Sequence, residues 1–577
     1  MQAVHDILSY GIAPSALTRY DHQVFPGAVP RSFVGPLLLA ILSYPFLLFW
    51  RIAGVVKTSA DVQVVVRLCL AAVNVTSIAY FCQETFASAS SPAKGNGLST
   101  SENERRQAVL FLIVTAAQFH FAFWASRTIP NSLALPLVTV ALAMVCRSIG
   151  TNNKDKHRVS SDARTAIWFL TFSAVVLRLE IAATLIPVGL YLLATRMISV
   201  WAALKTGIVS SFFSIGLTMA IDTYFWQDLS NSQAKGIFGI LASSLRNLTS
   251  GDQSKPLWPE LHALLFNVVD GKSSEWGVSP WHAYATSLIP KLLAFTGPLV
   301  VIGAVELLRD RSGVVKARAR FLLLSAATHV AILSMLGHKE WRFAFYTLPA
   351  LNVVAAIGAG RLTRSRQGTI VLSALLLLQL GLSWFTGYLS SINYPGGEAL
   401  RLLHQQLDQE GDGSRPIKVH IDVLPAMTGV TLFQSTRLDR FSGVLPASCA
   451  SDECWVYDKT EDLPVSGPEA VQAWSTFTHL ITEAPECRTL QDQKGELLAE
   501  TGQLFEPIAF PISSFAGLRR KAISQIKSDL LKLPREIASS LSSTDTDKET
   551  LLGALIRLAS PIIVVKQPSV WLCRRKL

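Results

Sequence analysis

The segment His338-Lys339-Glu340-Trp341-Arg342-Phe343 lies between two apolar runs, Phe321–Leu336 and Phe343–Gly360. We predict that both runs are membrane helices. The loop that joins them is too short to reach far from the bilayer, so its charged side chains lie at the depth of the lipid headgroups. Polar groups at that depth are costly unless they bind something. The segment therefore predicts a binding site at the membrane surface, where a lipid phosphate would lie.

The composition of the chain also predicts a membrane protein. Of its 577 residues 50% are hydrophobic and 16% are charged, and the mean hydropathy is +0.35. Soluble proteins carry about 25% charged residues. The net charge of +11 would also suit a nucleic-acid-binding protein. However, Lys and Arg cluster in short loops, and no basic–aromatic stripe or zinc pattern accompanies them, so we expect no nucleic-acid partner.

Eleven apolar segments are candidate membrane spans. They are residues 34–55, 62–83, 107–125, 131–147, 163–177, 179–194, 204–222, 290–308, 319–336, 343–360 and 369–389. The most basic loops are 148–162, 309–320 and 361–367, which the positive-inside rule places in the cytosol. Eleven spans would leave the two ends of the chain on opposite sides of the membrane. One early segment is therefore expected to be re-entrant, interfacial or miscounted.

Three regions follow from this pattern. Residues 1–33 are interpreted as a lumenal catalytic loop, and residues 34–389 as a multi-span membrane domain that carries a long lumenal loop at 223–289. Residues 390–577 are interpreted as a soluble lumenal domain. The predicted fold class is a mainly α, polytopic transmembrane helix bundle with a smaller C-terminal lumenal α/β domain.

The C-terminal region changes in composition after the bundle. Residues 417–423 alternate as in a strand, and residues 524–541 have a helical pattern. The apolar run 551–566 is interrupted by Pro561, and we interpret it as domain core or an interfacial element rather than as a span.

Two features would report on the side of the membrane. Asn247-Leu248-Thr249 is a glycosylation sequon in the 223–289 loop. Cys449 and Cys454 can form a disulfide if their loop is lumenal. The alternatives are that the sequon occurs by chance and that the two cysteines are free thiols.

Two Asp–His pairs precede the first predicted span. They are His5-Asp6 and Asp21-His22. A carboxylate there can accept a proton from a hydroxyl group as it attacks, so Asp21 and then Asp6 are candidate bases, with His22 beside them. Arg31 can face a phosphate. The alternative is an ordinary polar loop next to the membrane, with Asp21 as a helix cap.

Further charged groups lie in or beside the predicted spans. Arg127 precedes the turn at Pro130, where it contacts a headgroup or simply snorkels to the interface. Arg178 and Glu180 form an ion pair at membrane depth. Charged residues at membrane depth commonly mark a functional site. However, Arg178 and Glu180 could equally well only neutralise each other's charge within the helix bundle.

Polar and aromatic residues around the 223–289 loop suit a sugar. They include Asp222, Glu275 and Trp276. Aromatic rings stack on sugar faces while polar groups bind hydroxyls. The alternative is an aromatic belt at the membrane interface.

The segment His338–Phe343 is the strongest candidate for phosphate binding. Lys339 and Arg342 are natural donors to a phosphate, His338 can bind the same group, and Glu340 would orient them. The alternative is positive charge at a membrane edge. No Walker loop, GxSxG or HExxH pattern occurs in the sequence.

Together these segments resemble the endoplasmic-reticulum mannosyltransferases that use dolichyl-phosphate-mannose, a family of GT-C type. The mark of the whole family resembles His338-Lys339-Glu340-x-Arg342-Phe343. Within the family, the chain is most similar to the branch of α-1,6-mannosyltransferases that act on Man7GlcNAc2-PP-dolichol in N-glycan assembly. The similar segments are residues 20–31, 126–131, 178–180, 222–226, 272–277, 393–397, 420–422 and 428–430.

The resemblance implies an inverting, metal-independent transfer that needs no cofactor, in a multi-pass protein of the endoplasmic-reticulum membrane. Donor and acceptor would both be lipid-linked. The donor phosphate is assigned to His338, Lys339 and Arg342, with Arg31 and Arg127 as further contacts. Asp21 is the first candidate base and Asp6 the second, with His22 grouped with them. The orienting or acceptor-binding residues would be Glu340, Arg178, Glu180, Asp222, Glu275 and Trp276.

One departure from the family matters. Its members usually begin with another membrane helix and a Glu-Glu-Ser pattern before the segment matching residues 2–6, so a helix and a candidate acid are expected to be missing here, as in a truncated or an inactive form. Three alternatives stay open. They are an α-1,2-mannosyltransferase of the same family acting on the N-glycan precursor or a glycosylphosphatidylinositol anchor, a non-catalytic paralogue, and a transporter or scramblase.

Overall fold

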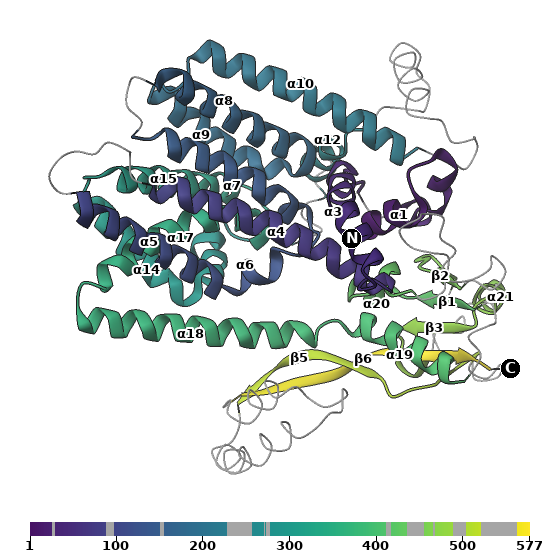
Figure 1. Ribbon diagram of the computed structural model, residues 1–577. Coiled ribbons are helices and arrows are strands. Elements are labelled where there is room, and N and C mark those ends of the chain that lie inside the picture. Colours follow the sequence, from purple (N-terminus) through teal and green to yellow (C-terminus); the bar gives the residue numbers. More distant parts are fainter. Residues whose placement is uncertain are drawn as a thin grey trace. The chain divides into compact units, whose positions relative to one another are not determined.

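The computed structural model is mainly helical and carries a small sheet near the C-terminus (Figure 1). It describes residues 1–25, 29–87, 97–150, 155–227, 257–269, 272, 277–410, 417–435, 455–464, 468–487, 504–520 and 562–576. The chain divides into two compact units. The first comprises Met1, residues 3–57 and residues 61–383, and the second comprises Gln2, residues 58–60 and residues 384–577. The main division falls inside the long helix α18.

Helices make up the first unit. In chain order they are α1 (Gln2–Tyr10), α2 (Asp21–Val24), α3 (Val34–Ile52), α4 (Ser59–Phe86), α5 (Gly97–Ala117), α6 (Phe119–Trp124), α7 (Pro130–Ser148), α8 (Lys156–Phe172), α9 (Ala182–Ala194), α10 (Val200–Phe225), α12 (Pro259–Leu264), α13 (Ile289–Leu293), α14 (Gly297–Arg309), α15 (Val314–Ser334), α16 (Trp341–Ala344), α17 (Leu348–Leu362) and α18 (Arg366–Ser391).

Seven helical segments within the described part of the chain are long and apolar enough to cross a membrane. They are Val34–Ile52, Ser59–Phe86, Pro130–Ser148, Val200–Phe225, Tyr284–Arg309, Trp341–Leu362 and Arg366–Ser391, and Leu179–Ala194 is a shorter apolar helix. The polytopic helical fold predicted from the sequence is thereby confirmed. The other predicted spans fall on α5, α8, α9 and α15, which are shorter or less apolar.

One predicted span is interrupted. The run 107–125 is not a single helix, because α5 ends at Ala117 and α6 begins at Phe119. Gln118 between them has an extended backbone, with φ −82° and ψ 125°. Its side chain donates to Thr296 Oγ1 at 2.8 Å and to Asn352 Oδ1 at 3.0 Å. Hydrogen bonds of this kind hold membrane helices together, so the break in the helix serves packing.

Helix α17 lies at the centre of the first unit. Every residue from Leu348 to Gly360 is buried, and the helix packs against α5, α14 and α15. Glycine allows the closest contact, which is with α14: a Cβ on Gly358 would lie 2.1 Å from the carbonyl oxygen of Leu299, and one on Gly303 would lie 1.9 Å from that of Val354. Small residues at a helix interface permit this backbone approach.

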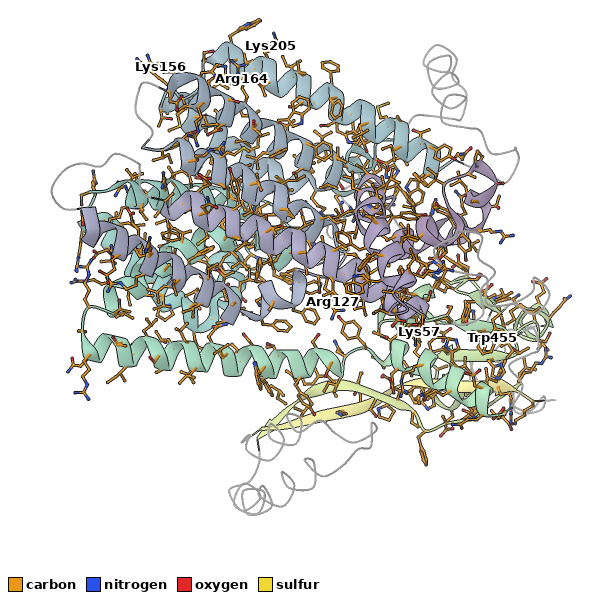
Figure 2. The ribbon with its side chains drawn as sticks, viewed as in Figure 1. Lys57, Arg127, Lys156, Arg164, Lys205 and Trp455 are labelled. Atoms are coloured by element: carbon orange, nitrogen blue, oxygen red, sulfur yellow. A yellow bond between two sulfur atoms is a disulfide. The ribbon has the colours of Figure 1, made fainter. Side chains whose placement is uncertain are left out.

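Helices α8 and α10 pack side by side towards the outside of the same unit. The ring of Trp168 in α8 lies 5.5 Å from that of Phe213 in α10. Lys156, Arg164 and Lys205 gather at one end of this pair of helices (Figure 2). Helix α9 joins the two helices in the sequence and packs on both of them.

The second unit contains a six-stranded sheet with the order β2-β1-β3-β6-β4, in which β5 also pairs with β6. Its strands are β1 (Lys418–Ile421), β2 (Val456–Asp458), β3 (His479–Thr482), β4 (Phe505–Pro507), β5 (Ile512–Arg520) and β6 (Ile562–Arg575), and its helices are α19 (Pro395–Gln409), α20 (Val423–Met427) and α21 (Pro468–Trp474). Strands β1, β2 and β3 are parallel, whereas β6 runs antiparallel to β3, β4 and β5. The predicted α/β character is confirmed.

The strands of this unit can be compared with the segments predicted from the sequence. Residues 418–421 of the alternating run 417–423 form β1, and residues 562–566 of the apolar run begin β6 rather than a span. A disulfide joins Cys487 to Cys573, which lie 86 residues apart, and the sequence analysis did not predict it. Residues 524–541 and the pair Cys449 and Cys454 lie outside the described residues.

Candidate active site

The N-terminal carboxylates hold their own segment together. Asp6 is buried, and its carboxylate accepts a hydrogen bond from His5 Nδ1 at 2.9 Å. It accepts a second from the backbone N–H of Asp21 at 3.0 Å, so it satisfies a donor at the start of α2. Asp21 itself is half-buried. Of the two predicted bases, Asp21 is therefore the more accessible.

His22 is anchored rather than presented to a substrate. Its Nε2–H donates to the carbonyl of Phe225 at 2.7 Å. Its ring lies 4.6 Å from that of Trp226 and 4.8 Å from that of Phe33. Burial lowers the pKa of His22, so the imidazole is neutral at pH 7. The side chain fixes the N-terminal segment to the end of α10.

Asp222 fixes the chain that leads to Arg31. This buried carboxylate accepts hydrogen bonds from the backbone N–H of Phe33 at 2.6 Å, from Ser32 Oγ at 2.9 Å and from Thr218 Oγ1. Trp226 next to it donates from its indole to the carbonyl of Arg31 at 3.0 Å. Protein groups thus engage both oxygens of Asp222, which positions Arg31.

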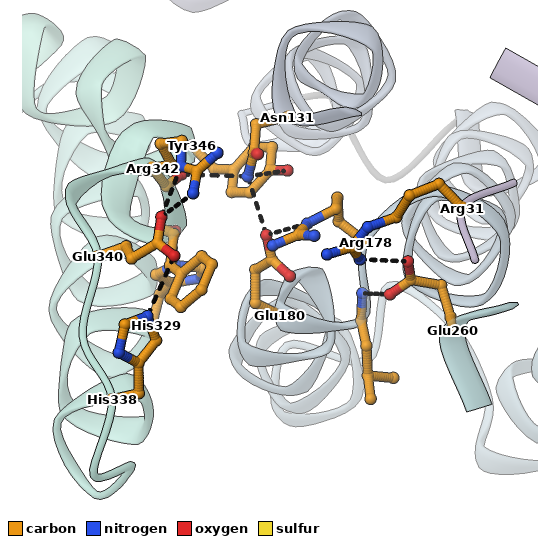
Figure 3. Close-up of polar contacts among 12 residues, drawn as sticks. Arg31, Asn131, Arg178, Glu180, Glu260, His329, His338, Glu340, Arg342 and Tyr346 are labelled. Atoms are coloured by element: carbon orange, nitrogen blue, oxygen red, sulfur yellow. Dashed lines mark hydrogen bonds and ion pairs between the residues drawn. The ribbon is translucent and has the colours of Figure 1, made fainter. Parts of the chain in front are cut away.

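Glu260 lies at the start of α12 and ties Arg31 to the turn before α9. Its Oε1 is 3.8 Å from the guanidinium of Arg31, and its Oε2 accepts from the backbone N–H of Leu179 at 2.9 Å (Figure 3). Glu260 is 5% exposed, whereas Arg31 is 50% exposed. Burial raises the pKa of Glu260 to about 7 despite the two neighbouring guanidinium groups. No motif in the sequence points to Glu260.

The predicted pair Arg178 and Glu180 is present and is linked to a further helix. Arg178 Nε donates to Glu180 Oε1 at 2.9 Å. Asn131, in the first turn of α7, donates to the same oxygen at 2.9 Å and lies 3.1 Å from Tyr346 Oη. It also lies 3.3 Å from the carbonyl of Arg342 (Figure 3). Asn131 therefore joins the ion pair to the segment around Arg342.

Glu340 organises the segment His338–Phe343. It accepts from Arg342 Nε at 2.5 Å and from His338 Nε2 at 3.1 Å. Although burial favours the neutral acid, these two donors lower the pKa of Glu340. Tyr284 also holds the backbone here, because its hydroxyl donates to the carbonyl of Glu340 at 3.0 Å. Glu340 therefore contacts His338 and Arg342, two of the residues that it is predicted to orient, and the role itself stays a prediction.

Lys339 points into the protein. It is 8% exposed, and its ammonium group donates to the carbonyls of Ser279 at 3.1 Å and of Leu336. His338 likewise contacts the carbonyl of Gly277, at 3.1 Å. These contacts hold the backbone at Gly277 and Ser279 against the segment His338–Phe343. Lys339 thus has one N–H left for a phosphate, although the sequence analysis gave it a leading role.

The remaining predicted residues lie elsewhere. The guanidinium of Arg127 stacks over the ring of Phe123 at 4.2 Å. Glu275, Trp276 and Asn247 lie outside the described residues, so their predicted roles stay predictions.

Three arginines gather at this site. Arg31, Arg178 and Arg342 interact electrostatically, and burial together with the neighbouring cations lowers the pKa of Arg31. Arg178 is only 12% exposed, whereas Arg342 is 39% exposed. Arg31 and Arg342 are therefore the cations best placed to meet a ligand. Guanidinium groups bind phosphate through paired hydrogen bonds, so the arrangement suits a phosphate ester.

No pattern in the sequence indicates that Glu260 and Asn131 belong to this cluster. Asn131 lies in the segment 126–131 that resembles the family, but no role was predicted for its amide. Glu260 follows Pro259 at a helix start, a common position for a carboxylate. Only the fold shows that its partners are Arg31 and Leu179.

Comparison with known proteins identifies the family of this chain. Residues 5–427 match the model of the Alg9-like mannosyltransferase family. The Dol-P-Man:Man(7)GlcNAc(2)-PP-Dol α-1,6-mannosyltransferase of Saccharomyces cerevisiae is 32% identical over 514 residues, which are 85% of this chain and 80% of that protein. The enzyme of the same name from Arabidopsis thaliana is 29% identical over 492 residues, or 84% of this chain and 81% of that protein.

Among solved structures, a distant likeness is to ArnT from Cupriavidus metallidurans bound to undecaprenyl phosphate. The TM-score is 0.42 at 12% identity, and the match covers 68% of this chain and 61% of that one. The family assignment rests on the sequence matches, which confirm the resemblance inferred from the motifs. The chain belongs to the Alg9-like mannosyltransferase family.

Proposed function

We propose that this protein transfers mannose from dolichyl-phosphate-mannose to dolichol-pyrophosphate-linked Man7GlcNAc2, in α-1,6 linkage, at the lumenal face of the endoplasmic-reticulum membrane. The observation that carries the proposal is the similarity over 85% of the chain to the yeast enzyme of that name. The cluster of Arg31, Arg178 and Arg342 beside predicted membrane helices supplies the chemistry that a lipid phosphate needs.

Arg31 and Arg342 would hold the donor phosphate. The dolichyl phosphate leaves as an anion, so its departure needs cationic hydrogen-bond donors more than a proton. Both guanidinium groups are partly exposed, and each is oriented by a carboxylate: Glu260 for Arg31 and Glu340 for Arg342. This pairing lets each arginine keep a fixed direction while presenting other N–H groups to the ligand. The proposed reaction involves no metal and no cofactor.

The acceptor hydroxyl would attack the anomeric carbon from the opposite face. A carboxylate within reach of that hydroxyl would accept its proton. Asp21 is our candidate, because Asp6 is buried and bonded within its own segment. Glu180 and Asn131 would act by holding Arg178 and the backbone of Arg342 in place.

The test is mannose transfer in yeast microsomes that lack their own α-1,6-mannosyltransferase. The chain is expressed there with a C-terminal epitope tag, and labelled dolichyl-phosphate-mannose is supplied. We expect the accumulated Man7 lipid-linked oligosaccharide to gain one mannose that α-1,2-mannosidase does not remove. Arg342→Ala should lower the gain about tenfold or more at donor concentrations below the KM, while the matched control Arg366→Gln, an exposed arginine at the start of α18, should keep it.

Two outcomes would refute the proposal. One is persistence of Man7 in microsomes that contain the tagged chain and in which the yeast enzyme restores conversion. The other is extension of a different precursor with an α-1,2-linked mannose, which would assign the chain to another branch of the same family.

A further inference from the structure

An apolar groove lies between α8, α9 and α10, away from the site described above. The cavity has a volume of about 630 Å³, and its walls consist almost wholly of aliphatic and aromatic side chains. Several of these are openly exposed, including Leu190 at 62% and Phe212 at 74%. Because α10 is long and apolar enough to cross a membrane, this surface faces lipid rather than water.

Two glycines, which have no side chain, keep the groove open. Gly189 of α9 and Gly207 of α10 both line it, and a Cβ built on either would meet no atom within 4 Å. An added Cβ at either position would therefore enter open space without a clash. The groove is therefore a hollow in the lipid-facing surface that a hydrocarbon chain can occupy, since hydrocarbon is the solvent there and an empty cavity forfeits dispersion contacts.

Three cations flank the part of this hollow nearest the turn between α9 and α10, where the lining residues of α10 extend past Lys205 to Val200. Arg164 lies one helical turn before the lining residue Ile167, Lys205 lies one turn before Ile208, and Arg196 lies in the turn that joins α9 to α10. Figure 2 shows Arg164, at the middle of α8, on the same side of the molecule as Lys205 in the first part of α10. All three cations are exposed, and within the described part of the chain none forms an ion pair with a carboxylate.

The nearest acidic side chain on these helices is already engaged. Asp162 of α8 is paired with Arg147, at 2.9 Å from its Nε. The only other carboxylates from α8 to the end of α10 are Asp155 at the start of α8, and Glu180 and Asp222 near the opposite ends of α9 and α10. The groove thus combines a hydrocarbon-lined trough with an excess of positive charge at its mouth.

We propose that this groove binds an anionic phospholipid of the membrane, with an acyl chain along the trough and the phosphate on Arg164, Arg196 and Lys205. An anionic amphiphile matches both parts of the site, whereas a zwitterionic lipid matches only the trough. The site is separate from the reacting lipids: α9 has 13 residues, or about 20 Å of helix, between Glu180 and the turn that holds Arg196.

The test uses the full chain purified in detergent and native mass spectrometry with defined lipids. Phosphatidylserine and phosphatidylcholine with identical acyl chains are added at equal concentration. We expect one retained phosphatidylserine per chain and at least a tenfold lower retention of phosphatidylcholine. Gly207→Leu fills the trough, and Arg164→Gln combined with Arg196→Gln and Lys205→Gln removes the charge. Each should reduce retention of phosphatidylserine tenfold or more.

Matched controls separate these effects from general damage. Gly216→Leu adds the same side chain to α10 at a glycine that also has open space but does not line the groove, and it should retain the lipid. Arg366→Gln removes an exposed cation elsewhere and should do the same. If Gly207→Leu fails to elute as a monodisperse peak in gel filtration, Gly189→Leu replaces it.

Three results would overturn the proposal. They are equal retention of the two phospholipids, unchanged retention in the groove-filling and charge-removing variants, and displacement of phosphatidylserine by an equimolar amount of dolichyl phosphate. The last would assign the groove to a polyprenyl chain instead. None of these readouts depends on mannose transfer.

Discussion

Replacing Glu260 by glutamine should uncouple Arg31 from its buried carboxylate while keeping the acceptor for the N–H of Leu179. The pKa of Glu260 is raised by burial from 4.5 to about 7. A raised folded-state pKa means that this group favours the folded state fully below pH 4.5 and loses that contribution as the pH rises through 7. The difference corresponds to about 3 kcal/mol at higher pH.

Glu260→Gln removes this dependence because glutamine does not titrate. We expect the variant to gain thermal stability relative to the wild type between about pH 5.5 and about pH 8, by up to the 3 kcal/mol above. Activity should move the other way. The ion pair with half-exposed Arg31, at 3.8 Å, is worth at most about 1 kcal/mol, so the KM for dolichyl-phosphate-mannose should rise about two- to fivefold.

The assay is thermal unfolding of the detergent-solubilised protein at both pH values, together with donor titration in microsomes. Glu260→Ala also leaves the partly buried N–H of Leu179 without its side-chain acceptor, which costs up to about 1–3 kcal/mol and should make it less stable than Glu260→Gln. Glu398→Gln, in an exposed pair with Arg401, is the control and should change neither quantity. A stability difference between Glu260→Gln and wild type that is the same at both pH values would refute this reasoning.

Four further changes test other parts of the structure. Arg342→Ala should raise the donor KM about tenfold or more, because it removes a charge-assisted donor to phosphate; an unchanged KM would exclude that contact. Asp21→Ala should lower kcat by about 10²–10⁴-fold in microsomes, and full activity would remove it as the base. Gly303→Ala should destabilise the protein by about 1–3 kcal/mol in thermal unfolding, because its Cβ would strike the backbone of α17, whereas Gly189→Ala should be neutral; equal effects would contradict the close packing. Cys487→Ser should destabilise the C-terminal sheet by about 2–4 kcal/mol, measured by limited proteolysis with and without reductant, and an unchanged digestion pattern would contradict this.

The membrane helices could be predicted because a lipid environment selects apolar side chains over a fixed length. The same reasoning located the pair Arg178 and Glu180, since charges at that depth stand out from their surroundings. It misjudged the run 107–125, where Gln118 interrupts the helix. A single amide does not lower the hydropathy of a window enough to reveal a break, and its partners on α14 and α17 are distant in the sequence.

The candidate site could be predicted only in part. Residue type identifies Lys339 as a cation near the membrane surface, but the direction of its side chain depends on the carbonyls of Ser279 and Leu336. Glu260 has no periodic pattern around it, and the N–H that it binds lies 81 residues away. The pairing of Cys487 with Cys573 was equally hidden, because spacing does not determine which of seven cysteines join.

The position of β6 in the sheet has a consequence for biosynthesis. It is the last of the six strands in chain order, yet it lies between β3 and β4 and also pairs with β5. While the polypeptide is still being synthesised, β3, β4 and β5 therefore keep open hydrogen-bonding edges until residue 575 has emerged from the ribosome. Folding of this sheet must follow the synthesis of β6, so a nascent chain stalled even a few residues earlier would expose unpaired strands to chaperones and to aggregation.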